Sequence, residues 1–167
     1  MELRGERVVL RTLANADAAK LVKIGHEPEF RRWWPDLDEA NLASKVAGTS
    51  GAVVFAITLL DKVIGIAQFY EEDDPQYRHA GIDLGIATAW QNQGLGTDVV
   101  RTLVHHLVNE RGHHRLVIDP AADNHRAIRC YEKVGFRGVG VMRRYERGHD
   151  GTWHDGLLMD LLAPELT

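Results

Sequence analysis

Three β-rich segments that lead directly into a glycine loop constrain the fold of this chain most strongly. Residues 52–60 and 63–70 are separated by only two residues, a spacing typical of an antiparallel hairpin. Residues 80–87 add a third strand to this meander. In the segment over residues 91–107, a Gly-Leu-Gly loop enters a helix with a broad stripe of Leu and Val. The sequence therefore predicts an antiparallel sheet region that ends at a loop and a helix.

The remaining elements surround this meander with shorter strands and helices. In chain order, they are a strand over 8–12, helices over 14–27 and 36–48, and, after the meander and the loop helix, a strand over 115–119, a helix over 124–134 and a hairpin of strands 136–145 and 153–162. Asn15 is expected to cap the first helix and Gly135 to end the last. The order β-α-α-β-β-β-α-β-α-β-β predicts an α/β (α+β) fold, with a mixed, mostly antiparallel central sheet flanked by helices. No linker or repeat divides residues 1–167, so we expect one domain.

Charge and cysteine content exclude several classes of protein. The formal net charge of −4 argues against a nucleic-acid binder and suits a cationic substrate. The apolar runs are too short to span a bilayer, and the charged N-terminus is unlike a signal peptide. The single cysteine, Cys130, fits a reducing cytoplasm and is expected to be an inert thiol. We therefore expect a cytoplasmic monomer or homodimer that binds neither nucleic acid nor membranes.

The glycine loop is typical of phosphate binding, and three kinds of loop compete for it. A P-loop needs a Gly-Lys-Ser/Thr sequence, which this segment lacks. A dinucleotide fingerprint needs a third glycine where Val99 stands, and an early parallel βαβ unit. The third pattern is Gln-x-x-Gly-x-Gly between a strand and a helix. In this pattern, the glycines let the main chain approach a diphosphate closely, and the helix N-terminus supplies N–H donors.

The third pattern, at residues 91–96, resembles the pyrophosphate arm of the GCN5-related N-acetyltransferases. The segment 124–136 resembles the second signature of that family, N-x-x-A-x-x-x-Y-x-x-x-G-F, which puts Asn124, Ala127 and Tyr131 on one helix face. The resemblance implies the GNAT fold and acetyl-CoA as the cofactor. The cofactor contacts expected on this basis are Leu84, Gly85, Ile86, Gln91, Asn92, Gln93, Gly94, Leu95, Gly96, Thr97, Asn124, Ala127 and Tyr131.

Members of that family transfer acetyl directly to an amine, so the resemblance also implies an acid and a base. Tyr131 is expected to protonate the leaving thiolate. Asp83 is expected to act as the base, because a charged residue in a core strand is costly unless it faces a cleft or a partner. Asp119 is expected near Asp83 if the two strands separate at the cofactor. Glu71 and Glu72 are alternative bases that would act through a water molecule.

Within the family, the chain is similar to the aminoglycoside 6'-N-acetyltransferases. The shared features include an acidic loop, the Gly-Ile-Asp and Gly-Leu-Gly-Thr sequences, and the paired Trp33 and Trp34. Five acids against one arginine between residues 71 and 83 independently favour a polycationic aminosugar. The substrate contacts expected are Trp33, Trp34, Glu71, Glu72, Asp83, Asp119 and Asp150.

Other acceptors stay open at the level of sequence. The closing residues 145–162 resemble a branch that acetylates protein N-termini, and parts of 118–129 resemble siderophore enzymes that acylate hydroxylysine. A non-catalytic acyl-CoA sensor is disfavoured because Asp83 and Tyr131 are both retained. The nine histidines lack the spacing of a zinc site, so no metal is expected.

Overall fold

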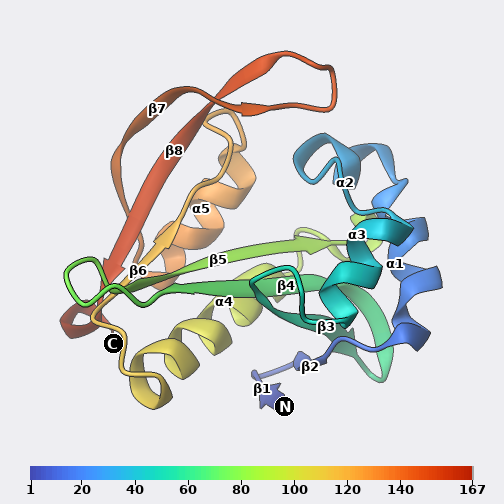
Figure 1. The fold of residues 1–167 in the computed structure, drawn as a ribbon, viewed down its shortest axis with the longest axis horizontal. Coiled ribbons are helices and arrows are strands. Elements are labelled where there is room, and N and C mark those ends of the chain that lie inside the picture. Colours follow the sequence, from blue (N-terminus) through green and yellow to red (C-terminus); the bar gives the residue numbers. More distant parts are fainter. Residues whose placement is uncertain (167) are drawn as a thin grey trace.

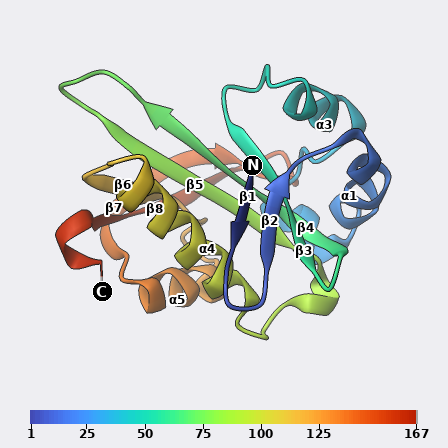
Figure 2. The same ribbon diagram turned by 90° about the horizontal axis from the view of Figure 1, so that it is seen from below.

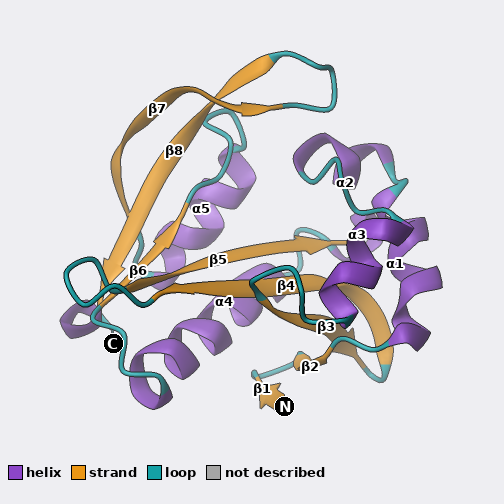
Figure 3. Cartoon of the chain, viewed as in Figure 1, coloured by secondary structure: helices purple, strands orange, loops and turns teal. Residues whose placement is uncertain are grey.

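The computed structural model describes residues 1–166, which form an eight-stranded sheet in the order β1-β2-β3-β4-β5-β6-β8-β7 (Figure 1). The strands are β1 (Glu2–Arg4), β2 (Val9–Thr12), β3 (Val53–Leu59), β4 (Lys62–Glu72), β5 (His79–Ile86), β6 (Arg115–Ile118), β7 (Arg137–Arg147) and β8 (Trp153–Leu162). The helices are α1 (Ala18–Gly25), α2 (Pro28–Trp33), α3 (Glu39–Val46), α4 (Leu95–His105) and α5 (His125–Val134) (Figure 3). Only β5 and β6 pair in parallel, so the predicted mixed, mostly antiparallel sheet is confirmed.

Two hydrophobic clusters hold helices against opposite faces of the sheet. One cluster joins β3, β4 and β5 to α4 and α5 through residues such as Phe69, Leu103 and Tyr131. The other joins β3, β4 and Ala87, the residue after β5, to α1, α2 and α3 through residues such as Leu21 and Leu42. Figure 2 shows α4 beside α5, and α1 beside α3 on the other side of the strands. No helix among residues 1–166 has the length and apolarity needed to cross a membrane.

Strands β5 and β6 separate soon after they meet, and this separation positions the site. They pair only at Ala80–Leu116 and Gly81–Val117, although β5 continues to Ile86. Figure 1 shows β6 leaving β5 at an angle, with β8 and β7 following β6 away from the rest of the sheet. The last residues of β5 therefore have no strand partner on the β6 side. Ligands of open sheets commonly bind at such an opening beyond the carboxyl ends of the strands.

Several predicted boundaries need correction. The sequence analysis missed β1, which is only three residues long, and α2, which begins at Pro28 as a separate helix. Proline is favoured in the first turn of a helix, because its missing N–H would have no partner there. Asn15 does not cap the first helix. The carboxylate of Asp17 instead accepts the Ala14 N–H at 2.9 Å and the Arg11 guanidinium at 2.7 and 2.8 Å.

The turns around the site follow the predicted chemistry more closely. Leu60 and Asp61 have φ values of 48° and 62°, so both turn residues of the β3–β4 hairpin are left-handed, one residue earlier than predicted. Gly135 ends α5 with φ 118°. The side chain of Asn124 accepts the Ala127 N–H at 3.2 Å and thereby caps the start of the same helix.

Candidate active site

Two cavities meet where β5 and β6 separate. The first has a volume of about 370 Å³ and extends along the start of α4 and one face of α5. The second has a volume of about 540 Å³ and lies between α2, α3, β5, β6 and the β7–β8 hairpin. Five residues line both cavities: Trp33, Trp34, Leu84, Asn124 and Tyr131. A molecule in the first cavity can therefore present a reactive group to a molecule in the second.

The start of α4 gives the first cavity the geometry of an anion site. Gly94 stands before the helix with φ 78°, and Asn92 is also left-handed with φ 60°. The first N–H groups of α4 have no partner within the helix, and they carry the positive end of its dipole. Gly96 lies close to α5, since a Cβ at this position would stand 3.3 Å from the Cys130 Sγ. The glycines thus leave room for a diphosphate at the helix N-terminus.

Most of the predicted cofactor residues lie together in this first cavity. The lining includes Leu84, Gly85, Ile86, Gln91, Asn92, Gly94, Gly96, Thr97, Asn124, Ala127 and Tyr131. Gln93 and Leu95 are not part of the lining. Leu95 is buried in the core, and the Gln93 side chain donates to the Ala89 carbonyl at 3.1 Å. Gln93 precedes the helix, and Leu95 belongs to the apolar stripe of α4 that packs into the core, so both side chains face other surroundings.

Helix α5 adds three cations to the first cavity that the sequence analysis did not assign. Arg126, Arg129 and Lys133 all line it. They follow the spacing of Asn124, Ala127 and Tyr131, shifted by two residues, so this pattern was available in the sequence. Arg126 also lies 3.6 Å from the Glu29 carboxylate of α2. A polyanionic cofactor thus finds fixed positive charge along α5 in addition to the main-chain donors of α4.

Tyr131 stands at the junction of the two cavities, and its side chain is 8% exposed. Its ring packs edge-on against Phe136, with 6.4 Å between the ring centroids. Burial raises the pKa of the Tyr131 hydroxyl, and nearby negative charges raise it further. The hydroxyl is therefore held protonated at neutral pH and can serve as a proton donor.

Asp83 lies on β5 with its side chain in the second cavity. Burial raises the pKa of its carboxyl above the usual range, while a hydrogen bond from Gln68 at 3.0 Å opposes that shift. A carboxylate whose pKa lies above the ordinary value is better matched to accept a proton near neutral pH. Asp83 thus lines the cavity with a carboxyl group whose pKa is raised.

Asp119 follows β6 and faces the same cavity as Asp83, as predicted from the strand separation. The Tyr145 hydroxyl donates to Asp119 at 2.7 Å, and this bond raises the pKa of Tyr145 to about 12. One of the Asp119 oxygens is thus held by β7. The negative charge of Asp119 also raises the pKa of Asp83, after the larger effect of burial.

The second cavity is acidic, and half of its carboxylates come from segments that were not assigned from the sequence. Six acids line it, Asp36, Asp83, Asp119, Asp123, Glu146 and Asp150, against the fixed cations Arg32 and Lys45. Burial raises the pKa of Glu146, and Asp119 and Asp83 add to that shift. A buried acceptor, Asn41 Oδ1, has no hydrogen-bond partner within residues 1–166. Such a cavity favours a ligand with several ammonium groups.

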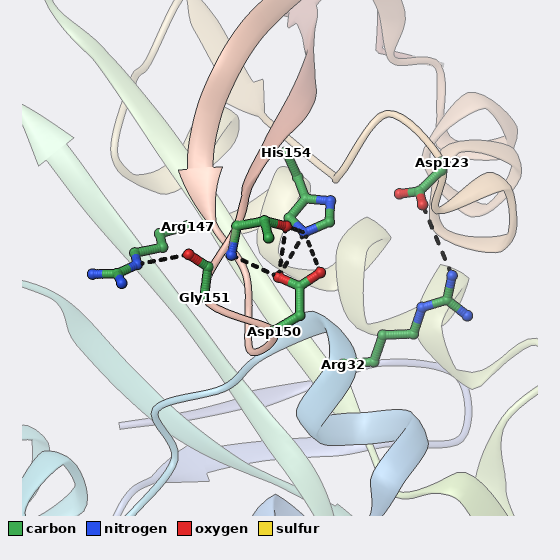
Figure 4. A network of polar contacts seen from close by, with 7 residues as sticks. Arg32, Asp123, Arg147, Asp150, Gly151 and His154 are labelled. Carbon is green, nitrogen blue, oxygen red and sulfur yellow. Dashed lines mark hydrogen bonds and ion pairs between the residues drawn. The ribbon is translucent and has the colours of Figure 1, made fainter.

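The tip of the β7–β8 hairpin faces α2 across this cavity (Figure 4). Asp150 accepts from the Thr152 N–H at 2.9 Å and pairs with His154 at 2.9 Å. His154 holds the pKa of the Asp150 carboxyl well below its usual range, and Asp150 raises the pKa of His154. On the α2 side, Arg32 lies 3.8 Å from Asp123. Trp33, Trp34 and Asp150 thus line the cavity at the positions expected for substrate contacts.

Glu71 and Glu72 do not lie in the cavity, contrary to expectation. Glu71 pairs instead with the Arg111 guanidinium and with His113 Nε2 at 2.7 Å, which lowers its pKa to about 2. Glu72 accepts the Asp74 N–H in the β4–β5 loop. Figure 1 shows this loop at the opposite end of β5 from α2 and the hairpin tip. Neither carboxylate is near the junction, and the strongly lowered pKa makes Glu71 a poor base.

Two further residues support the site without touching the junction. The Asp98 carboxylate is 6% exposed and accepts the main-chain N–H groups of residues 6, 7 and 8 at 2.8–3.0 Å, which ties the β1–β2 turn to α4. Cys130 lines the first cavity beside Thr97 Oγ1 at 3.4 Å, and burial raises the pKa of its thiol. A raised pKa keeps Cys130 in the unreactive thiol form, as expected from the sequence. Residues 1–166 contain no group of three or more His, Cys, Asp or Glu side chains that could hold a metal ion.

Comparison with known proteins defines the class of this fold and site. The model of the acetyltransferase (GNAT) domain matches residues 7–137. The chain therefore belongs to the GNAT acetyltransferase family and is an N-acetyltransferase. A GNAT acetyltransferase from Bacillus anthracis has the same fold, with a TM-score of 0.84 over 99% of this chain and 100% of that chain, at 19% identity.

The relatives within the family narrow the comparison. The chain is 35% identical over 158 residues to the aminoglycoside N(6')-acetyltransferase type 1 of Klebsiella pneumoniae, a match that covers 82% of this chain and 77% of the relative. It is 48% identical over 73 residues to a kanamycin resistance protein of Rhizobium radiobacter, covering 43% of this chain and 66% of the relative. The structure of AAC(6')-Ib with ribostamycin and coenzyme A is similar with a TM-score of 0.74, 28% identity and 94% coverage of both chains.

Proposed function

We propose that this chain transfers the acetyl group of acetyl-CoA to the 6'-amine of an aminoglycoside. The observation that carries the proposal is the junction of two cavities of opposite character at Tyr131. The first cavity combines free helix N–H groups with three cations, which suits a phosphate-bearing cofactor. The second gathers six carboxylates, which suits a polycationic acceptor. The aminoglycoside acetyltransferases described above support this choice of cofactor and acceptor.

The residues of the first cavity fit coenzyme A. The main-chain N–H groups after Gly94 would hold the diphosphate, and the cations of α5 would meet further phosphate charge. Ala127 leaves space on α5 for a narrow chain, and the side-chain nitrogen of Asn124 is left for a ligand, because its oxygen caps the helix. When bound, acetyl-CoA supplies the acetyl group as a thioester.

The proposed chemistry assigns one task to each group at the junction. Asp83 accepts a proton from the acceptor ammonium and so produces the nucleophilic amine. Alternate main-chain N–H groups of β5 around Leu84, Gly85 and Ile86 face away from β4, beyond the last β6 pair, and stabilise the carbonyl oxygen. Tyr131 donates its hydroxyl proton to the departing sulfur. Asp119 and the acids of the hairpin and α2–α3 segment orient the other amines of the acceptor.

A coenzyme A release assay tests the proposal. The chain is given acetyl-CoA with kanamycin, with ribostamycin, or with a panel of N-terminal peptides, and the Asp83→Asn variant is the control. We expect the wild-type chain to turn over the aminoglycosides, and the Asp83→Asn variant to do so about 100-fold or more slowly. Turnover of the peptides alone would contradict the aminoglycoside assignment. Acetyl-CoA binding without turnover of any amine would contradict catalysis itself.

The proposed function is compatible with a cytoplasmic monomer or homodimer. We infer a cytoplasmic location, because a reducing compartment keeps the single thiol Cys130 free. The acceptor is a small cationic molecule, so a monomer or a homodimer satisfies the proposal equally.

A further inference from the structure

The acceptor cavity contains one cation that a cavity for cationic substrates does not obviously need. Lys45 of α3 lines this cavity, with its ammonium 5.7 Å from the centroid of the Trp34 ring. Burial lowers the pKa of Lys45. The Lys45 ammonium is half-buried; it repels an incoming ammonium substrate and costs desolvation energy, so its presence needs a compensating role.

Gln68 connects Lys45 to the proposed base. The Lys45 Nζ donates to Gln68 Oε1 at 2.6 Å, and Gln68 Nε2 donates to Asp83 Oδ2 at 3.0 Å. Gln68 and Asp83 are direct partners in the β4–β5 register, so the backbone fixes their proximity. The three side chains therefore form one continuous line of hydrogen bonds from α3 to the cavity.

The chemistry of these groups permits only one arrangement of the Gln68 amide. An ammonium has only donors and an ionised carboxylate has only acceptors. Lys45 must therefore hold the amide oxygen, and the amide NH2 must face Asp83. Hydrogen bonds to charged groups are stronger than neutral ones, and linked bonds polarise one another. Each bond in the line thus strengthens the donation to the Asp83 carboxylate.

We propose that Lys45 is a positioning residue, which acts through Gln68 to keep the Asp83 carboxylate ionised and directed into the acceptor cavity. This role deepens the proposed function, because it rests on Asp83 as the base. Several other titratable groups interact electrostatically with Asp83. They are Asp119 after β6, Tyr70 on β4, Tyr131 on α5, and Tyr145 and Glu146 on β7. Against these acids and phenols, Lys45 is the cation that favours the ionised form of Asp83.

The test measures the Asp83 pKa directly, by a carbon-13 NMR titration of its carboxyl in the whole chain. We expect Lys45→Met to raise this pKa by about one unit, a tenfold change in the ionisation constant. Lys45→Arg, which retains a cationic donor, is expected to leave the pKa within about 0.3 unit of the wild type. Lys62→Met, an exposed lysine on β4, is the matched control and should cause no shift. If Lys45→Met does not fold, Lys45→Gln removes the charge with a polar side chain.

A double-variant cycle separates action through Gln68 from direct attraction. In the Gln68→Leu background, Lys45→Met is expected to add less than about 0.3 unit to the Asp83 pKa, because the connecting amide is already lost. A full one-unit shift in that background would overturn the role of Gln68. An unchanged pKa in Lys45→Met alone would overturn the proposal entirely. The titration needs no acceptor amine, so its failure is distinct from a failure of the aminoglycoside assignment.

The same variants have a kinetic signature with any amine that the enzyme acetylates. The acidic limb of kcat/KM should move to higher pH by the same amount as the titrated pKa, with the acetyl-CoA dissociation constant unchanged. If Lys45 only balances charge in the cavity, its replacement should lower the KM for cationic substrates and leave the acidic limb of kcat/KM in place. That result would also overturn the proposal.

Discussion

Replacement of Tyr131 by phenylalanine removes a single hydroxyl from the junction of the two cavities. The ring and its contact with Phe136 at 6.4 Å stay in place, and the volume of the buried side chain hardly changes. We therefore expect the free energy of unfolding to change by less than about 1 kcal/mol. The dissociation constant for acetyl-CoA should stay within about twofold, since the main-chain donors of α4 and the cations of α5 are untouched.

The rate should respond far more strongly than stability or binding. A positioned general acid contributes roughly 100-fold to 10,000-fold, so kcat is expected to fall by about 100-fold or more, at least about 2.7 kcal/mol in activation free energy. The assay is steady-state release of coenzyme A, with binding and thermal unfolding measured on the same preparation. Tyr77→Phe, at a tyrosine that is 68% exposed in the β4–β5 loop, is the matched control. A kcat within tenfold of the wild type would refute Tyr131 as the acid.

Three further predictions concern the frame and the acceptor cavity. Asp98→Asn weakens the buried acceptor that holds three N–H groups, so it should lower the free energy of unfolding, measured in urea, by about 2–4 kcal/mol. The exposed control Asp73→Asn should change that free energy by less than about 0.5 kcal/mol. Equal stability of the two variants would contradict the role of Asp98 in tying the β1–β2 turn to α4. The pKa of Glu71 is lowered from 4.5 to about 2, so its contribution to stability is complete above pH 4.5 and is lost as the pH falls towards 2. Glu71→Gln should therefore lower the free energy of unfolding by about 1–2 kcal/mol at pH 7, allowing for solvent screening at the exposed Arg111, and by close to nothing near pH 2. Urea titrations at the two pH values measure this difference. Glu146→Gln should raise the KM for kanamycin about fivefold and weaken its salt dependence, and an unchanged KM would remove Glu146 from the acceptor site.

The parts of the site that lie within one continuous segment could be predicted from sequence. The loop at Gly94 and Gly96 and the α5 face with Asn124 and Tyr131 depend on local spacing, and spacing along a helix or a turn survives folding unchanged. Asp83 was expected to be the base because a carboxylate in a core strand is costly without a purpose. These residues line the two cavities as expected.

Two of the expected acidic substrate contacts, Glu71 and Glu72, lie at the wrong end of β5, whereas Asp83, Asp119 and Asp150 line the cavity as expected. Glu71 pairs across the sheet near the start of β5, opposite Ala80, whereas Asp83 lies three residues further along. At about 3.3 Å per residue, the loop before β5 lies roughly 10 Å or more from the base, at the wrong end of the strand. The unexpected carboxylates of the cavity, Asp36, Asp123 and Glu146, come from three distant segments that only the tertiary fold brings together.

The two cavities are proposed to deliver acetyl to one particular nitrogen of an aminoglycoside, and this regiochemistry can be measured. Its most direct measurement is two-dimensional NMR of the product formed by the chain from acetyl-CoA and kanamycin. We predict a single acetyl group, attached to the 6'-nitrogen. Acetylation at another nitrogen, or an unmodified kanamycin while an N-terminal peptide is acetylated, would contradict the claim.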